Sequence, residues 1–180
     1  MKRILIIATD GFEQSELMEP KSILEEAGAE TTVASLEDGS IKGWKDGNWG
    51  ESVDVDLTVD EIATGDYDAL LLPGGQINPD VLRMNDRVID LVREFDAAKK
   101  PVAAICHAPW LLAEAGIIEG RTVTGWPSIR TDLSNAGANV VDETVALDGN
   151  LITSRNPDDI PAFANTLMSA LEMNRVTENA

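Results

Sequence analysis

Short runs of apolar residues alternate along this chain with longer segments of helical periodicity. A continuous apolar run of a few residues is typical of a strand buried on both faces, whereas apolar positions three and four apart are typical of a helix. The predicted strands are residues 4–8, 31–34, 69–72, 102–105, 145–147 and 151–153, and the predicted helices are residues 16–27, 88–99, 109–115 and 161–173. This alternation predicts an α/β fold, with a mostly parallel sheet and helices on both of its faces.

Two segments depart from the regular pattern. Pro20 lies near the start of the first predicted helix, so we expect an irregular or kinked first turn there. Residues 37–51 hold four glycines and two tryptophans, and we expect them to form an excursion or hairpin outside the core. Nothing else resembles a linker or a repeat. Residues 1–180 are therefore interpreted as a single domain, long enough to bury a sizeable core.

Composition excludes several classes of function. The chain has 32 acidic and 14 basic residues and a formal charge of −18, which disfavours nucleic acids and anionic membranes as partners. One cysteine and one histidine exclude an intrachain disulfide and the common zinc sites, so we predict no metal. No apolar stretch approaches the roughly 18 residues of a membrane span, and the first apolar run is too short for a signal peptide. We therefore expect a cytoplasmic protein.

Candidate chemistry gathers after the predicted strands. In open parallel sheets, sites form beyond the carboxyl ends of the strands. Cys106 directly follows one strand and precedes a helix, where backbone N–H groups and the helix dipole favour a thiolate. The string Ala104-Ile105-Cys106-His107-Ala108 has the pattern of a nucleophile elbow, with alanines where glycines are common. The alternative is an inert, buried cysteine.

Three neighbouring features have both a catalytic and a structural interpretation. His107 reaches the cysteine only if the backbone turns sharply, and otherwise it makes local hydrogen bonds. Gly74-Gly75 either presents N–H groups to an oxyanion or serves only as a turn. Glu16 either lies above the sheet beside Cys106, where burial would raise its pKa and let it carry a proton, or is a charge at a helix start.

Together these stretches resemble the PfpI-like intracellular proteases and general stress proteins of the DJ/PfpI superfamily. The similar motifs run over nearly the whole chain: Gly11-Phe12-Glu13-Gln14-Ser15-Glu16-Leu17, Leu72-Pro73-Gly74-Gly75, Pro79-Asp80-Val81-Leu82-Arg83, Ala104-Ile105-Cys106-His107-Ala108-Pro109, Gly120-Arg121, Trp126-Pro127, Asp148-Gly149-Asn150 and Thr153-Ser154-Arg155. The resemblance implies a flavodoxin-like three-layer sandwich. It also implies a reactive Cys106 in a strained turn.

The resemblance further implies roles for the residues around the cysteine. Glu16 would hydrogen-bond the thiolate, and Gly74, Gly75 and His107 would form the oxyanion hole. In the protease-like branch, the acid that orients the histidine comes from a neighbouring subunit, and the matching position is Asp80. The protein would then be a homodimer or a homohexamer. The chain departs from the pattern at Ala108, where glycine is commoner, and at Asp80, where glutamate is expected.

The functional expectation is a cysteine-dependent stress-response enzyme without a cofactor. Its substrate would be a small carbonyl compound, in a glyoxalase III-like conversion of methylglyoxal to lactate or a related deglycation. The first alternative is a PfpI-type peptidase that uses Cys106, His107 and Asp80 on a peptide. The second is a non-enzymatic redox sensor or chaperone, because an accessible thiolate also oxidises readily.

Overall fold

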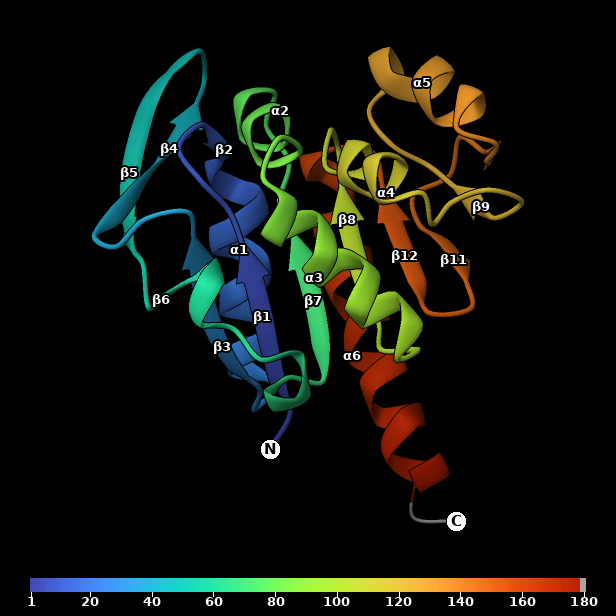
Figure 1. Cartoon of the computed structure of the whole chain (residues 1–180), viewed down its shortest axis with the longest axis horizontal. Helices are drawn as coiled ribbons and strands as arrows, with labels where there is room; N and C mark the ends of the chain where they lie inside the picture. Colours follow the sequence, from blue (N-terminus) through green and yellow to red (C-terminus); the bar gives the residue numbers. More distant parts are fainter. Residues whose placement is uncertain (179–180) are drawn as a thin grey trace.

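A seven-stranded sheet forms the centre of the molecule in the computed structural model, which describes the backbone of residues 1–178 and the side chains of residues 1–172. The strand order is β11-β12-β8-β7-β1-β3-β6, and every neighbouring pair is parallel except β11 and β12. The strands are β1 (Arg3–Ile7), β3 (Glu30–Ser35), β6 (Leu57–Thr58), β7 (Ala69–Leu72), β8 (Val102–Ile105), β11 (Ala146–Asp148) and β12 (Leu151–Ser154). Figure 1 shows the helices lying on both sides of this sheet.

Alternate residues of each central strand supply two separate cores. In β1, Ile4 and Ile6 pack with α1 (Gln14–Glu26) and α6 (Ile160–Glu178), while Leu5 and Ile7 pack on the other face with α3 (Asp86–Ala97) and α4 (Pro109–Ala115). Successive side chains of a strand point to opposite faces, so a continuous apolar run is needed to fill both layers. The structure therefore confirms the α/β sandwich that the apolar pattern predicted, with helices on both faces of the sheet.

Smaller elements surround this sandwich. A second sheet joins β2 (Phe12–Glu13) to the hairpin of β4 (Ser40–Lys45) and β5 (Asn48–Asp54), and a third pairs β9 (Thr122–Val123) with β10 (Asn139–Val140). Two short helices are α2 (Ile77–Leu82) and α5 (Arg130–Asn135). Single 3-10 turns lie at Val59–Glu61, Thr64–Asp66, Pro127–Ile129 and Pro157–Asp159. The hairpin confirms the prediction for residues 37–51.

The predicted elements agree closely with the structure. The bounds of β8 and α4 are those predicted, and Gly116 ends α4 in the left-handed conformation. The expected irregular first turn of the first helix is wrong, because α1 begins at Gln14 and stays helical through Pro20. Pro20 thus lies in the second turn, where it removes only the helical hydrogen bond to the Glu16 carbonyl. Among the described helices, none has both the length and the apolar character of a membrane span.

Candidate active site

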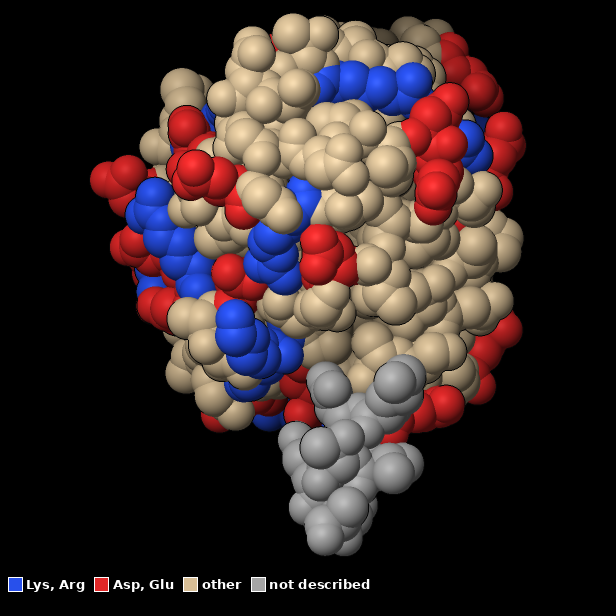
Figure 2. Space-filling view, turned by 90° about the vertical axis from the view of Figure 1, so that its right-hand side faces the viewer, with Lys and Arg blue, Asp and Glu red and all other residues tan. Residues whose placement is uncertain are grey.

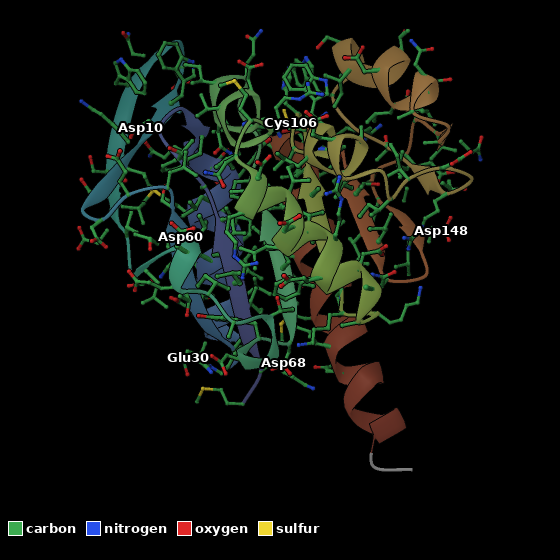
Figure 3. The ribbon with its side chains drawn as sticks, in the orientation of Figure 1. Asp10, Glu30, Asp60, Asp68, Cys106 and Asp148 are labelled. Carbon is green, nitrogen blue, oxygen red and sulfur yellow. The ribbon has the colours of Figure 1, made fainter. Side chains whose placement is uncertain are left out.

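Cys106 occupies a sharp turn between the carboxyl end of β8 and the start of α4. Its φ is +65°, a left-handed conformation that side-chain-bearing residues rarely adopt. The turn is held on both sides, because the Cys106 N–H donates to the Ser154 carbonyl at 3.0 Å and the Trp126 N–H donates to the Cys106 carbonyl at 2.8 Å. Figure 3 shows Cys106 at the same edge of the molecule as Asp10, opposite Glu30 and Asp68. The strained turn expected from the sequence is therefore present.

The thiol itself is more enclosed than the sequence suggested. We expected a residue exposed at the sheet edge, but Cys106 is only 6% exposed. Burial is the largest influence on the thiol and raises its pKa, and the charge of Glu16 raises the pKa further. The backbone N–H groups of Gly75 and His107 face the sulfur and lower the pKa. The amides predicted to favour a thiolate are in place, but desolvation opposes them.

Glu16 projects from the first turn of α1 into this enclosed space. It is fully buried, and its Oε1 accepts a hydrogen bond from the Gly74 N–H at 3.1 Å. Its Oε2 meets no partner of hydrogen-bond geometry within the described part of the chain, but the Cys106 side chain is near enough to lower the pKa of Glu16. Burial, together with the nearby Glu13 charge, raises the pKa of Glu16 to about 8. At neutral pH the carboxyl is therefore mostly protonated, and in that form it no longer opposes ionisation of the Cys106 thiol.

The Gly74-Gly75 loop follows β7 and packs against both of these residues. A Cβ on Gly74 would meet Glu16 Oε1 and the Cβ of Cys106, and a Cβ on Gly75 would meet the Gly11 carbonyl and the Glu13 amide. Gly75 also has a φ of +89°. Both positions consequently need glycine, and the close approach is what allows the Gly75 N–H to face the sulfur. The expected oxyanion role of Gly74 is wrong, because its N–H donates to Glu16 Oε1.

His107 is the nearest basic side chain to the thiol. Its Nδ1 lies 3.3 Å from the Cys106 Sγ, and its Nε2 lies 3.5 Å from the Ser128 Oγ. The imidazole ring stacks on Trp126 at a centroid distance of 5.8 Å and contacts Trp110 edge-on. Burial lowers the pKa of His107, so the ring is neutral at pH 7 and able to accept a proton.

Asp80 is not brought to His107 within one chain. It lies in the first turn of α2 with its side chain exposed, and none of the ion pairs among the described residues involves it. Ala108, the other departure from the family pattern, has a φ of −60° and is fully buried. The turn therefore does not require glycine at that position.

Asn78 is a site residue that sequence reasoning missed. Its buried side chain donates to the carbonyls of Pro73 and Gly74 at 2.9 and 3.1 Å, and it accepts from the Thr9 N–H at 2.8 Å. One amide thus ties the segment after β1 to the glycine loop after β7. An asparagine shortly after a Gly-Gly turn was the available signal. Ser128 was also missed, because nothing in the sequence places it opposite His107.

Comparison with known proteins agrees with this geometry. The model of the DJ-1/PfpI family matches residues 2–170. The chain belongs to the DJ-1/PfpI family. Among its relatives, general stress protein 18 of Bacillus subtilis is 46% identical over 172 residues, which cover 95% of this chain and 98% of that protein. Deglycase PfpI of Pyrococcus furiosus is 40% identical, with 94% and 99% of the two chains covered.

Two further DJ-1/PfpI proteins extend the comparison. YraA of Bacillus subtilis, named as a candidate cysteine protease, is 41% identical over 95% of this chain and 99% of its own. The crystal structure of Drosophila melanogaster DJ-1beta superposes with a TM-score of 0.87 at 33% identity, covering 94% of this chain and 90% of that one. These matches support the flavodoxin-like sandwich. The candidate site lies beyond the carboxyl ends of β1, β7 and β8, where sites form in such sheets. In the described residues, no group of three or more potential ligands gathers that could hold a metal ion.

Proposed function

We propose that this protein is a cysteine-dependent stress-response enzyme that acts on small reactive carbonyl compounds, with methylglyoxal as the model substrate. The observation that carries the proposal is the arrangement around one sulfur: Cys106 faces two backbone N–H groups, a neutral imidazole and a carboxyl group of raised pKa. The names of its relatives support the same class, because they include a general stress protein and a deglycase.

The first step is addition of the thiol to the aldehyde carbon. Neutral His107 takes the thiol proton at Nδ1, which lies 3.3 Å from the sulfur. The C–S bond forms, the carbonyl electron pair moves to oxygen, and the N–H groups of Gly75 and His107 stabilise the resulting oxyanion. Return of the proton from His107 to this oxygen gives a neutral hemithioacetal.

The second step moves a hydrogen between the two carbonyl-derived carbons. It requires a group that can both accept and donate a proton near neutral pH, and a carboxyl with a pKa of about 8 meets that requirement. Removal of the proton from the sulfur-bearing carbon, with a proton taken up by the former ketone oxygen, gives an enediol. Delivery of a proton to the neighbouring carbon and loss of the hydroxyl proton from the sulfur-bearing carbon then give a thioester of lactate. Water then hydrolyses the thioester, releasing lactate and restoring the thiol. The sum is methylglyoxal plus water giving lactate, with no external oxidant or cofactor.

The burial of Cys106 favours a small substrate over a polypeptide. A thiol that is 6% exposed is accessible to a three-carbon aldehyde more easily than to an extended backbone. Lactate formation should therefore be measured from methylglyoxal for wild type, Cys106→Ala and Cys106→Ser. We expect both variants to lose at least about 100-fold in rate, because each lacks the nucleophile. A wild type without turnover whose Cys106 is oxidised stoichiometrically by dilute peroxide would instead favour a redox sensor.

A peptidase is the second candidate, and the contact between Cys106 and His107 favours it. In that proposal Asp80 of a second copy orients His107, so the active unit is a homodimer or a homohexamer. Asp80→Asn separates the two candidates. It should lower hydrolysis of a fluorogenic peptide in the peptidase and leave lactate formation from methylglyoxal unchanged in the carbonyl enzyme. Sedimentation in the same buffer measures the oligomer size.

A further inference from the structure

A cavity of about 820 Å³ lies at the opposite edge of the sheet from Cys106. It is bounded by the end of α3, the turn of the β11–β12 hairpin and one side of α6. Its lining residues are Lys99, Pro101, Arg121, Leu147, Gly149, Asn150, Asn165, Thr166, Ser169 and Ala170. Cavities of roughly 300–1,000 Å³ are the usual size for small-molecule sites.

The cavity is separate from the candidate active site. Pro101 directly precedes β8 and Cys106 directly follows it, so their Cα atoms are separated by about 16 Å, five residue steps along an extended strand. Figure 3 shows Asp148, at the end of β11 and next to Gly149 of the lining, away from Cys106. A ligand in this cavity would therefore not touch the nucleophile, and its binding does not depend on the proposed carbonyl chemistry.

The charge of the lining is opposite to that of the chain. The whole protein has 32 acidic and 14 basic residues, yet the lining has one lysine, one arginine and no acidic residue. Figure 2 shows lysine and arginine side chains, with acidic side chains among them, beside a broad area without charged side chains on this face of the molecule. The lining thus combines positive charge with apolar surface from Pro101, Leu147 and Ala170.

The guanidinium of Arg121 already forms hydrogen bonds within the protein. It donates to Asp96 Oδ1 at 2.8 Å, to Asn150 Oδ1 at 2.7 Å and to the Asp148 carbonyl at 3.2 Å. The carboxylate of Asp148 accepts the Thr122 N–H at 2.7 Å. The carboxylates of Asp96 and Asp148 therefore already accept hydrogen bonds from groups of the protein. Lys99, by contrast, takes part in none of the ion pairs found within the described residues.

The backbone of Lys99 supplies a second, independent observation. Lys99 follows the end of α3 with a φ of +59°, a position where helices usually place glycine. The Lys99 N–H donates to the Asp96 carbonyl and the Lys100 N–H donates to the Phe95 carbonyl, which is the hydrogen-bond pattern of that glycine-type cap. A lysine held there at the cost of left-handed strain suggests a use for its ammonium group.

We propose that this cavity binds a small organic anion, a carboxylate, sulfonate or phosphate monoester carried on an apolar body. The Lys99 ammonium pairs with the anionic group. Asn165 and Ser169 supply hydrogen bonds from the exposed side of α6, and the apolar body packs on Pro101, Leu147 and Ala170.

The test uses two dyes that differ by a single sulfonate group. 1-Anilinonaphthalene-8-sulfonate carries an apolar body with one sulfonate, and N-phenyl-1-naphthylamine is the same body without it. Fluorescence titration of the folded wild-type protein should give saturable binding of the sulfonate, roughly tenfold tighter than binding of the neutral dye. Lys99→Gly should remove that advantage, Lys99→Arg should keep it, and Lys45→Gly, at an exposed position on β4, should leave it unchanged.

Stability separates loss of binding from loss of the fold. Glycine adopts the Lys99 conformation without strain, so Lys99→Gly should melt no lower than wild type. Lys99→Asn, which also tolerates the left-handed region, serves as a second charge-removing variant should the glycine variant fail to fold. Ser169→Phe should fill the cavity and block the sulfonate dye.

Three results would overturn the proposal. The first is equal affinity for the two dyes, and the second is undiminished sulfonate binding in both charge-removing variants. The third is a change of oligomer size in Ser169→Phe with dye binding retained, which would show a face between copies of the chain. Lactate formation from methylglyoxal is measured alongside. The rate of lactate formation should be unchanged in Lys99→Gly. Failure of the proposed anion site and failure of the proposed carbonyl activity would therefore give different results.

Discussion

The Sγ of Cys106 lies 3.3 Å from the Nδ1 of His107, although consecutive side chains of a strand point to opposite faces. The φ of +65° at Cys106 produces this contact, because it turns the chain out of the strand direction between the two residues. The same turn directs the His107 N–H toward the sulfur. One unusual backbone angle thus brings together a thiol, an imidazole and a backbone N–H, the groups to which we assign the roles of nucleophile, base and oxyanion donor.

His107→Gln should lower the rate of lactate formation by about 100-fold, because general-base assistance contributes roughly 10²–10⁴. Burial lowers the pKa of His107, so protonation of this base should slow wild type only below about pH 6.5, the ordinary histidine value, in addition to the decline that protonation of Glu16 causes below its pKa of about 8. The variant should lose only the decline below about pH 6.5. Trp126→Phe, which retains an aromatic ring beside the imidazole, is the control, and equal rates in His107→Gln and wild type would exclude His107 as the base.

Glu16→Gln should change how stability depends on pH. The pKa of Glu16 is about 8 in the folded protein and 4.5 as the model value, so between these limits the folded state holds one proton more than the unfolded state. Wild type should therefore lose stability as the pH rises from 4.5 to 8, by up to about 1.4 kcal/mol per pH unit from this group, and level off above that window.

Urea denaturation at pH 5, 6.5 and 8.5 measures the effect of Glu16. Relative to Glu16→Gln, the free energy of unfolding of wild type should be lowest at pH 8.5. At that pH the folded wild type buries a charged carboxylate, whereas glutamine is uncharged. Glu19→Gln, at an exposed position on the same helix, is the matched control. Parallel pH dependence in wild type and Glu16→Gln would mean that the carboxyl titrates normally.

Asn78→Ala should cost about 2 kcal/mol of stability, because it leaves the part-buried Thr9 N–H and the Pro73 carbonyl without their partners, while the Gly74 carbonyl keeps only the Glu13 N–H. Asn78 touches no reacting atom, so it acts by positioning the Gly74-Gly75 loop. We expect kcat to fall while KM changes little, because the oxyanion donor shifts. Asn48→Ala, at the exposed first residue of β5, should leave both stability and kcat unchanged. A variant that is destabilised but has normal kcat would show a purely structural role.

Gly75→Ala and Gly28→Ala separate steric crowding from backbone strain. Both glycines have positive φ, +89° and +97°. A Cβ at Gly28 meets nothing within 4 Å, whereas one at Gly75 meets backbone atoms of Gly11 and Glu13. Gly28→Ala should cost about 1 kcal/mol, the price of the left-handed conformation, and Gly75→Ala at least about 2 kcal/mol more. Equal losses in thermal melts would mean that the Gly75 loop can move away.

The sequence was most informative where one local rule decided the structure. Runs such as 102–105 must be buried on both faces, and glycine at position 116 ends a helix, so β8 and α4 could be predicted to the residue. The strand-end rule likewise located Glu16, Gly75, Cys106 and His107 in one region. Elements of two residues, such as β9, have no period to detect, and α2 was hidden by Pro79 within it.

The thiol environment was harder to predict because it depends on packing between distant segments. The sequence showed the amides and the helix that favour a thiolate, but not the depth at which the Gly74-Gly75 loop and Glu16 enclose the sulfur. Asn78 escaped notice for a similar reason, since its partners include Thr9, 69 residues away.

The two outermost strands of the large sheet are β6, with two residues, and β11, with three. Such short borders leave few unpaired backbone groups onto which a foreign strand could add. The large sheet is thereby protected against edge-to-edge aggregation. It also means that a second copy of the chain could hardly continue the sheet, so any assembly of subunits would have to be built through helices, loops or the β4–β5 hairpin.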